Sequence, residues 1–468
     1  MGTRTTDPEL LIVLERGSGR SLRSQLEDQL RAAVSTGALQ AGSPLPSTRT
    51  FAADLGVSRR LVVEAYDQLV AEGYLSTRPG GRTVVGGEAR TPERREAPRR
   101  DVAYDLLPGT PDLASFPRTA WARATTNVLR STANDALRYP DPAGAWALRS
   151  SLAAYLRRVR GVEADPDQIV ICAGVRQGLA LLVNALRMDR TPAIGLEDPG
   201  IFEGKSIIEA AGGRARPLLV DEEGVQVANL DGLDAVVLTP AHQFPTGVVL
   251  SAARRSALLH WSAQERLLIE DDYDAEFRYD REPVPTLHSE APNHVAYTGS
   301  VSKTLAPALR LGWIVLPSHL VSGVVRAKQL HDAGMAVLPQ LTFAEMLGRG
   351  EYDRHLRRAR QHNRKRRGAL LAALDRYLPG VRISGAEGGI HVLATFPADV
   401  DGRTLSRAAS RRGLDVALVD EFRVTPSGQS AQLVIGYGNM PETSVEPAVR
   451  LLESAFRQSR DSRNRTAE

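Results

Sequence analysis

Apolar residues recur at helical spacing near the start of the chain. Leu22, Leu26, Leu30 and Val34 stand four residues apart, so they fall on one face of an amphipathic helix, and Gly37 follows as a stop signal. The pattern therefore predicts a first helix that begins near residue 21.

Two serines in capping positions predict two further helices. Ser47 precedes a short helix, and Ser58 precedes a longer one from 59 to about 72, because a serine side chain can accept a hydrogen bond from a free N–H of the first turn. Two short strands, at 74–77 and 83–85, are expected to follow around a basic, glycine-rich tip. Three helices followed by a hairpin form the order of a winged helix-turn-helix.

From residue 104 onward, short apolar runs alternate with helical stretches. This spacing predicts an α/β domain with a mostly parallel central sheet wrapped by helices. A smaller C-terminal α+β subdomain is expected from about residue 331, with a helix at 352–378 and strands at 389–395 and 432–436. The predicted strands of the large sheet include 169–172, 193–196, 235–239, 267–271 and 312–316.

These patterns divide the chain into consecutive segments. Residues 1–12 are a leader, 13–85 are the predicted winged helix, and 86–104 are a linker of Gly, Pro, Glu and Arg with almost no apolar content. Residues 105–456 form the predicted α/β domain. The polar tail at 457–468 is expected to be disordered.

Composition limits the classes of protein without choosing a function. Of the 468 residues, 42% are hydrophobic and 24% are charged, as in ordinary globular proteins. The net charge of +4 permits a nucleic-acid partner but does not require one. Cys172 is the single cysteine, which excludes an internal disulfide framework, and no apolar run reaches membrane-spanning length. We expect a cytoplasmic protein, and assign no metal site.

The predicted winged helix offers several candidate contacts to double-stranded DNA. Ser58 opens the third helix, whose free N–H groups and positive dipole end can face a phosphate. Arg59 and Arg60 lie in its first turn, where a recognition helix meets base edges. Charges in residues 1–85 nearly cancel, so a solvated charged face is the alternative. Phosphate contacts are expected from Ser47, Arg49, Arg78 and Arg82.

The same region resembles a known family of transcriptional regulators. The GntR family has a DNA-binding signature to which this chain is similar in LPSTR at 45–49, AADLGVSR at 52–59, AY at 65–66 and EGYL at 72–75. Several fixed spacings hold at once, which makes the match specific. The resemblance implies that residues 13–85 bind DNA.

A lysine marks the second candidate site. Lysine occurs only as Lys205, Lys303, Lys328 and Lys365, and the other cationic positions are arginine. Lys303 stands in the run GSVSKTLAPALRLGW at 299–313, after small hydroxyl residues. A lysine amine can lose its proton and attack an aldehyde, which an arginine does not do. A surface lysine in a loop rich in serine and threonine is the alternative.

This run resembles the lysine motif of the fold-type I enzymes, which hold pyridoxal 5′-phosphate (PLP). In those enzymes the lysine forms a Schiff base with PLP, while a serine and an arginine hold its phosphate. The resemblance assigns these roles to Lys303, Ser300 and Arg310.

Two earlier stretches resemble the phosphate-binding parts of the same enzymes. The run GVRQG at 174–178 lies between a predicted strand and a predicted helix, where backbone amides bind phosphate well. The resemblance places Val175 and Arg176 in the phosphate site. In YPDPAG at 139–144, it implies that Tyr139 reaches the phosphate of the cofactor in the partner subunit of a dimer.

Other stretches resemble the part that holds the pyridine ring. Asp271 ends a predicted buried strand, where a carboxylate can pair with the ring nitrogen and keep it protonated. The resemblance implies that Tyr273 and Gln243 bond the phenolic oxygen, and that Phe202 or Ile201 stacks on the ring. A metal site or a solvated loop is the alternative for the acidic cluster around Asp271.

A winged helix fused to an aminotransferase-like domain is the signature of the MocR/GabR subfamily of GntR regulators. The resemblance covers nearly all of residues 20–455. It implies a transcriptional regulator that binds operator DNA and changes activity on binding PLP, alone or with an amine or amino-acid effector. It also implies a homodimer, generally head-to-tail and domain-swapped.

One strand departs from the aminotransferase pattern. Those enzymes place an arginine on the penultimate strand, where it grips the substrate's α-carboxylate with two hydrogen bonds. Here Val434, or at best Gln432, takes that place, and Arg423 lies in a predicted loop. The departure weakens the alternative of a PLP-dependent aminotransferase with a vestigial DNA-binding domain. A partner-binding module with an inactive PLP site is a third hypothesis.

Overall fold

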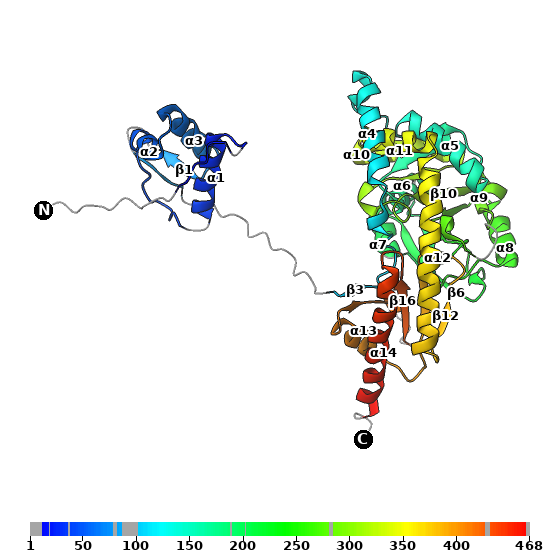
Figure 1. The fold of residues 1–468 in the computed structure, drawn as a ribbon. Helices are drawn as coiled ribbons and strands as arrows, with labels where there is room; N and C mark the ends of the chain where they lie inside the picture. The colour runs from blue at the N-terminus through cyan, green and yellow to red at the C-terminus, as the bar shows by residue number, and fades with distance from the viewer. Residues whose placement is uncertain are drawn as a thin grey trace. The chain divides into compact units, whose positions relative to one another are not determined.

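The computed structural model describes residues 12–17, 19–35, 38–77, 82–86, 102–187, 190–201, 203–279, 284–425 and 431–464. The chain divides into two compact units, Met1–Arg99 and Arg100–Glu468, and each is described by itself (Figure 1). Within the described ranges, no helix has both the length and the apolar character needed to cross a membrane.

The first unit has the predicted order of elements. Leu26 and Leu30 are fully buried and pack with apolar residues of all its helices, so the four-residue spacing marked the core face. Its elements are the helices α1 (Leu22–Ser35), α2 (Thr48–Leu55) and α3 (Arg59–Ala71), and the antiparallel strands β1 (Leu75–Thr77) and β2 (Thr83–Val85).

Both predicted helix caps are present in this unit. Ser47 Oγ accepts a hydrogen bond from the N–H of Thr50 at 3.1 Å, and Ser58 Oγ accepts one from the N–H of Leu61 at 3.3 Å. Gly56 has a φ of 62° between α2 and α3, a left-handed conformation that favours glycine. Local capping and turn chemistry therefore fix where α2 ends and α3 begins.

The second unit is built on an eight-stranded sheet with the order β4-β11-β10-β9-β8-β5-β6-β7. Neighbouring strands in the series β10, β9, β8, β5 and β6 are parallel, whereas β7 and β11 run antiparallel to their neighbours. The predicted mostly parallel sheet is therefore confirmed. The strands are β4 (Ile169–Cys172), β5 (Ala193–Asp198), β6 (Arg214–Asp221), β7 (Gly224–Val225), β8 (Ala235–Leu238), β9 (Leu267–Asp271), β10 (Val295–Ser300) and β11 (Gly312–Val315).

Helices cover both faces of this sheet, which explains why its central strands read as continuous apolar runs. On β4, Val170 and Cys172 pack toward α6, α7 and α10, while Ile169 and Ile171 pack toward α5, α11 and α12. The helices are α4 (Arg118–Ser131), α5 (Trp146–Arg160), α6 (Val175–Leu186), α7 (Gly204–Ala210), α8 (Ala252–Ser262), α9 (Leu287–Glu290), α10 (Ser318–Asp332), α11 (Val337–Gly348) and α12 (Glu351–Tyr377).

A smaller α+β subdomain completes the second unit, as the pattern predicted. Its antiparallel sheet has the order β12-β13-β16-β15, and α12, α13 and α14 pack together beside it (Figure 1). The short strand β3, at the start of the unit, pairs in parallel with β14. These elements are β3 (Tyr104–Asp105), β12 (Arg382–Ser384), β13 (His391–Thr395), α13 (Gly402–Ser410), β14 (Leu414–Asp415), β15 (Ala417–Leu418), β16 (Gln432–Gly436) and α14 (Glu442–Asn464).

The C-terminal tail differs from its prediction. Helix α14 continues to Asn464, so the expected disorder is wrong for residues 457–464. The helix is anchored by buried Leu452 and Ala455, and Arg460 forms an ion pair with Asp399 at 3.2 Å. Packing of the earlier turns of α14 thus allows the helix to continue through the polar residues that follow. Residues 465–468, and residues 87–101 of the predicted linker, lie outside the described residues.

Candidate functional site

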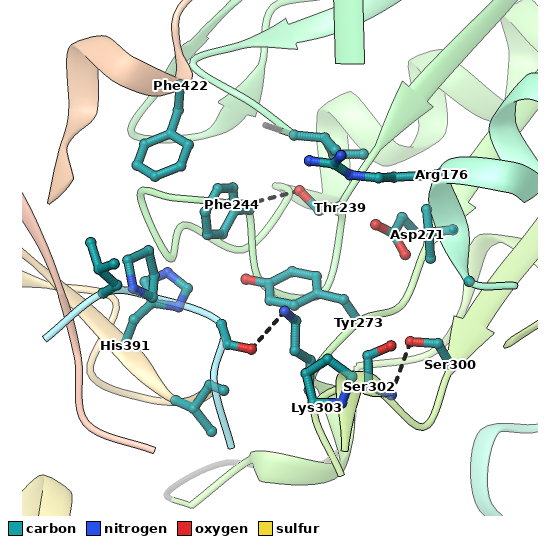
Figure 2. A pocket seen from close by; sticks show the side chains of 18 of the residues that line it. Arg176, Thr239, Phe244, Asp271, Tyr273, Ser300, Ser302, Lys303, His391 and Phe422 are labelled. Carbon is teal, nitrogen blue, oxygen red and sulfur yellow. Dashed lines mark hydrogen bonds between the residues drawn. The ribbon is translucent and has the colours of Figure 1, made fainter. Parts of the chain in front are cut away.

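A cavity of about 500 Å³ lies where the strand ends of the large sheet meet the small subdomain (Figure 2). Asp271 ends β9, Ser300 ends β10, and α6 begins just after β4. Carboxyl ends of parallel strands share one edge of a sheet, which is the usual place for a ligand in an α/β fold. The structure brings these predicted site residues to the cavity wall: Val175, Arg176, Asp271, Tyr273, Ser300, Lys303 and Arg310.

Glycines shape the wall at the start of α6. Gly174 precedes the helix with a φ of 105°, and it has no side chain that could cap the first turn. Gly312 on β11 approaches it so closely that a Cβ there would stand 2.8 Å from Gly174 Cα. The first residues of α6, Val175 and Arg176, therefore line the cavity, where the positive end of the helix dipole favours an anion.

Ser300 and Arg310 add polar groups to the cavity wall. Arg310 has a φ of 49°, a left-handed conformation that costs energy for a residue with a side chain and that collects at functional sites. Ser300 Oγ accepts a hydrogen bond from the N–H of Ser302 at 3.3 Å. Hydroxyl, guanidinium and helix N-terminus together suit a phosphate.

Asp271 is a buried carboxyl on the floor of the cavity. Thr298 Oγ1 donates a hydrogen bond to Asp271 Oδ1 at 3.2 Å. Burial raises the pKa of Asp271 to about 7, although the hydrogen bond from Thr298 acts in the opposite direction. A buried carboxyl of this kind is stabilised in its charged form by a cationic partner, such as a protonated ring nitrogen.

Lys303 reaches the cavity from the loop after β10. Its Nζ donates a hydrogen bond to the carbonyl oxygen of Gly109 at 2.7 Å. Burial lowers the pKa of the Lys303 amine, while the nearby carboxylates of Asp271 and Asp274 act against that shift. Gly109 has a φ of 91°, and a Cβ there would stand 2.7 Å from Lys303 Nζ. A glycine at this position therefore leaves room for the lysine.

Tyr273 is held by a buried histidine. Its hydroxyl oxygen lies 3.1 Å from His242 Nδ1, which is also 2.9 Å from Asp274 Oδ2. Burial acts to lower the pKa of His242, but the carboxylate of Asp274 leaves it raised. His391 offers a third ligand atom within 4.8 Å, close enough for a metal ion. His242 is already engaged with Asp274 and with the carbonyl of Gly385, so we assign no metal.

These groups fit PLP by the chemistry of their donors. One part of the wall suits a phosphate, a buried carboxyl suits a pyridine nitrogen, and a buried amine of lowered pKa suits an aldehyde. Tyr273 adds a hydroxyl to the cavity wall, which would suit the phenolic oxygen of the cofactor. Each polar end of the cofactor thus has a residue of matching chemistry on one wall.

Two further predicted cofactor residues, Gln243 and Tyr139, do not line the cavity. Gln243 is buried away from the cavity, because its amide nitrogen donates to the backbone oxygens of Pro199 and Phe244. The side chain of Tyr139 is 95% exposed and does not line this cavity. Ile201 lines the cavity, whereas Phe202 lies outside the described residues.

An apolar cluster surrounds Val434, the residue that takes the place of the aminotransferase arginine. Val434 is fully buried on β16 and packs with Leu393, Ala417 and Phe422. Gln432 donates a hydrogen bond to Thr395 Oγ1 at 3.2 Å. The structure thus has a buried valine on the strand where aminotransferases carry the arginine, in line with the departure noted in the sequence.

Sequence reasoning missed the wall contributed by the small subdomain. Figure 2 shows Phe422, Phe244 and His391 on one side of the cavity, across from Arg176 and Asp271. Phe244 directly follows Gln243, which was a predicted cofactor residue. Nothing local in the sequence indicates that the ring of Phe244 meets that of Phe422. That contact depends on how the subdomain packs.

The DNA-binding candidates of the first unit are exposed. Arg59 and Arg60 begin α3, and Arg60 pairs with Glu64 at 2.7 Å. Arg49 on α2 and Arg82 before β2 are exposed as well. Ser47 and Ser58 cap the helices, as described above. Arg78 lies outside the described residues.

Two family models match this chain. Residues 22–85 match the bacterial regulatory proteins of the gntR family, and residues 108–447 match aminotransferase class I and II. The chain is 33% identical to the HTH-type pyridoxine biosynthesis transcriptional regulator PdxR of Corynebacterium glutamicum, over 93% of this chain and 96% of the relative. It is 31% identical to the probable rhizopine catabolism regulatory protein MocR of Rhizobium meliloti, over 95% and 96%.

Solved structures resemble the second unit. The multiple substrate aminotransferase of Thermococcus profundus matches with a TM-score of 0.70 and 26% identity, over 77% of this chain and 93% of that chain. The α-aminoadipate aminotransferase LysN of Thermus thermophilus, complexed with N-(5′-phosphopyridoxyl)-L-leucine, matches with a TM-score of 0.69, 26% identity and the same coverage. The fold around the cavity is therefore that of the fold-type I aminotransferases.

Proposed function

This chain belongs to the MocR/GabR subfamily of GntR-type transcriptional regulators, and from that premise we propose that it binds PLP in the cavity of its second unit and changes its affinity for operator DNA in response. The single observation that carries the proposal is the cavity itself. It gathers Lys303, Asp271 and the N-terminus of α6 on one wall. The relative PdxR is named for pyridoxine biosynthesis, and LysN was solved with a phosphopyridoxyl compound, which both support PLP as the ligand.

Each residue of the wall has a proposed task. Val175 and Arg176 bind the phosphate through the start of α6, with help from Ser300 and Arg310. Asp271 holds the proton on the ring nitrogen. The carboxyl gains a cationic partner there, which lowers the cost of its burial.

Lys303 and Tyr273 act at the other polar groups of the cofactor. PLP, when bound, supplies an aldehyde that reacts with amines. Lys303 presents its amine to that carbon, and its lowered pKa increases the unprotonated fraction that can react. Tyr273 donates a hydrogen bond to the phenolic oxygen and is oriented by His242. Ile201, which lines the cavity, or Phe202, the next residue in the sequence, packs against the ring.

The DNA is contacted by the first unit. Arg59 and Arg60 read base edges at the start of α3, and Ser58 places the helix N-terminus near a phosphate. Arg49, Arg78, Arg82 and Ser47 bind the backbone of the DNA.

We propose that the protein acts as a homodimer, because Tyr139 is too exposed to line the cavity of its own chain. We assign it to the cofactor phosphate of a second copy. We further propose a head-to-tail, domain-swapped arrangement of the two copies. Sedimentation of the purified protein tests the dimer, and Tyr139→Phe tests the shared site through the PLP affinity.

An absorbance titration with PLP tests the cofactor, and a gel-shift titration with and without PLP tests the response. The DNA is the intergenic region beside its own gene. We expect PLP to change the dissociation constant for this DNA by roughly 5- to 150-fold, the range of ordinary allosteric coupling. An unchanged affinity in saturating PLP contradicts sensing. Rapid multiple-turnover transamination would instead favour the aminotransferase alternative.

A further inference from the structure

The small-subdomain wall of the cavity has no task in holding PLP. The groups assigned to phosphate, ring and aldehyde come from the large sheet and its loops, whereas Ile390, His391, Ala417 and Phe422 line the opposite wall. Figure 2 shows Phe422, Phe244 and His391 there, with Tyr273 between them and Asp271. This wall is the place for a second ligand group beside the cofactor.

Aromatic rings dominate this wall. Phe244 meets Phe422 at a ring-centroid distance of 4.9 Å and an interplanar angle of 86°, and it meets His391 at 5.3 Å and 67°. Phe244 and Phe422 are partly exposed where they line the cavity. Ring surface that is exposed to the cavity favours a ligand with an aromatic or branched apolar body.

Among the residues that the structure describes, this wall offers no cation to a carboxylate. Among the described lining residues the cations are Arg176, Lys303 and Arg310, which the proposed function assigns to the cofactor. Arg423 is turned to Asp420, at 3.5 Å, and does not line the cavity. The lining acid of the wall is Glu421, which would repel an anion.

Neither His391 nor the residue at position 434 supplies the missing cation. His391 is buried among aromatic rings, and burial together with nearby His242 lowers its pKa well below the usual value, so the ring stays neutral. Val434 lies behind Ala417 and Phe422 in the apolar cluster. A carboxylate placed here would lose its water without gaining a charged partner, which costs far more than burying an apolar group.

We infer that this wall selects a primary amine with an aromatic or branched apolar body and no carboxylate, as the effector that acts with PLP. The inference rests on the proposed function, because the amine must meet a bound cofactor. It deepens that function by excluding free α-amino acids from the effector class. The wall then distinguishes an amine from the amino acid of the same side chain.

Matched pairs of ligands test this inference directly. Phenethylamine and phenylalanine share a ring and an amine and differ by one carboxylate, and tyramine and tyrosine form a second pair. Each is titrated into PLP-loaded full-length protein by calorimetry, after dialysis to remove free PLP. We expect each amine to bind at least about tenfold more tightly than its amino acid, as an unpaired buried charge implies. Equal or tighter binding of the amino acid, or no binding of either amine, overturns the inference.

Variants locate the binding at this wall. Phe422→Ala should weaken phenethylamine roughly tenfold, by removing a buried ring contact. Leu219→Ala, an exposed apolar position on β6 outside the cavity, is the matched control and should leave the affinity unchanged. Val434→Arg should raise the affinity for phenylalanine relative to phenethylamine. Because Val434→Arg can disturb the core, Glu421→Arg, at an exposed position that lines the cavity, provides a second test of the same gain.

The order of measurements separates this inference from the proposed function. Uptake of PLP is measured first, by absorbance. Failure to take up PLP contradicts the proposed function before any amine is added. Uptake of PLP with no preference for amines over amino acids contradicts only the inference about the wall.

Discussion

The two units place their functional charges in opposite surroundings. Arg59 and Arg60 stand exposed at the start of α3, whereas Asp271 is buried at the end of β9 and Lys303 is partly buried beside it. Exposed charges are screened by salt, and buried charges respond to pH and to the partner they meet. The first unit is therefore suited to binding a polyanion through long-range electrostatic attraction. The second unit is suited to recognising a small molecule by its individual groups.

The largest effect is expected from removing the buried amine. Lys303→Ala should lower the affinity for PLP by at least about 100-fold, because the variant loses the covalent attachment. The absorbance of the PLP-loaded protein in the visible range measures this. Lys365→Ala, an exposed lysine on α12, is the control and should bind PLP normally. A Lys303→Ala variant that keeps the full visible absorbance and PLP affinity contradicts the assignment.

Asp271 is expected to stabilise the complex with PLP and to destabilise the PLP-free protein. Its pKa is about 7 in the fold against an ordinary 3.8, so the folded state binds this proton more tightly than the unfolded chain. The stability contributed by Asp271 therefore falls as pH rises from about 4 to about 7. Asp271→Asn removes that dependence and should raise the stability of the PLP-free protein at pH 8 by a few kcal/mol, at most about 4.

The same variant should bind PLP roughly 10- to 100-fold more weakly, since an amide does not pair with a protonated ring nitrogen. Thermal melting at pH 5.5 and pH 8, with and without PLP, measures both effects. Asp375→Asn, an exposed acid on α12, provides the control. If Asp271→Asn melts lower than the parent protein at pH 8 without PLP, burial does not set the behaviour of this carboxyl.

An intermediate effect is expected from the exposed arginines. Arg59→Ala or Arg60→Ala should weaken operator binding by about 1–3 kcal/mol and relax the sequence preference. Arg82→Ala should weaken all DNA alike and reduce the salt dependence. Gel-shift titrations at several salt concentrations with operator and unrelated DNA separate the two patterns. Arg403→Ala, exposed in the second unit, is the control. Equal weakening of both DNAs by every variant would contradict the division between base and phosphate contacts.

The smallest effect is expected at a helix cap. Ser58→Ala removes the hydrogen bond that the N–H of Leu61 donates to the Ser58 hydroxyl oxygen, and should destabilise the first unit by about 1 kcal/mol. Ser58→Gly should cost only a few tenths of a kcal/mol. Circular dichroism melting of the full chain measures the loss, and PLP binding should not change. An equal loss for the two variants argues against the cap.

The same contrast explains what could be predicted from sequence. The helices of the first unit are specified by capping serines and by a turn glycine a few residues away, so local reasoning placed them to within one or two residues. Strands β4 and β9 were predicted at their observed bounds, because strands buried on both faces read as uninterrupted apolar runs.

The cavity could be predicted only in part. Asp271, Ser300 and Lys303 stand at strand ends, and the topology of a parallel sheet brings such positions together. The amide of Gln243 is instead used by backbone oxygens, and the ring of Phe422 reaches Phe244 across the sheet edge. Those contacts depend on packing between distant segments, which no local pattern encodes. The helical continuation of α14 to Asn464 depends on packing in the same way.

The pairing of β3 with β14 has a mechanical consequence. At the start of the second unit, Tyr104–Asp105 pairs with β14 of the small subdomain. The chain then reaches Gly109, whose carbonyl accepts a hydrogen bond from Lys303. A ligand that binds Lys303 competes with the hydrogen bond that the lysine amine donates to Gly109. A ligand that moves the small subdomain also moves the pair of β3 and β14. The chain thus enters the second unit only a few residues before Leu107, Pro108 and Gly109, which line the cavity.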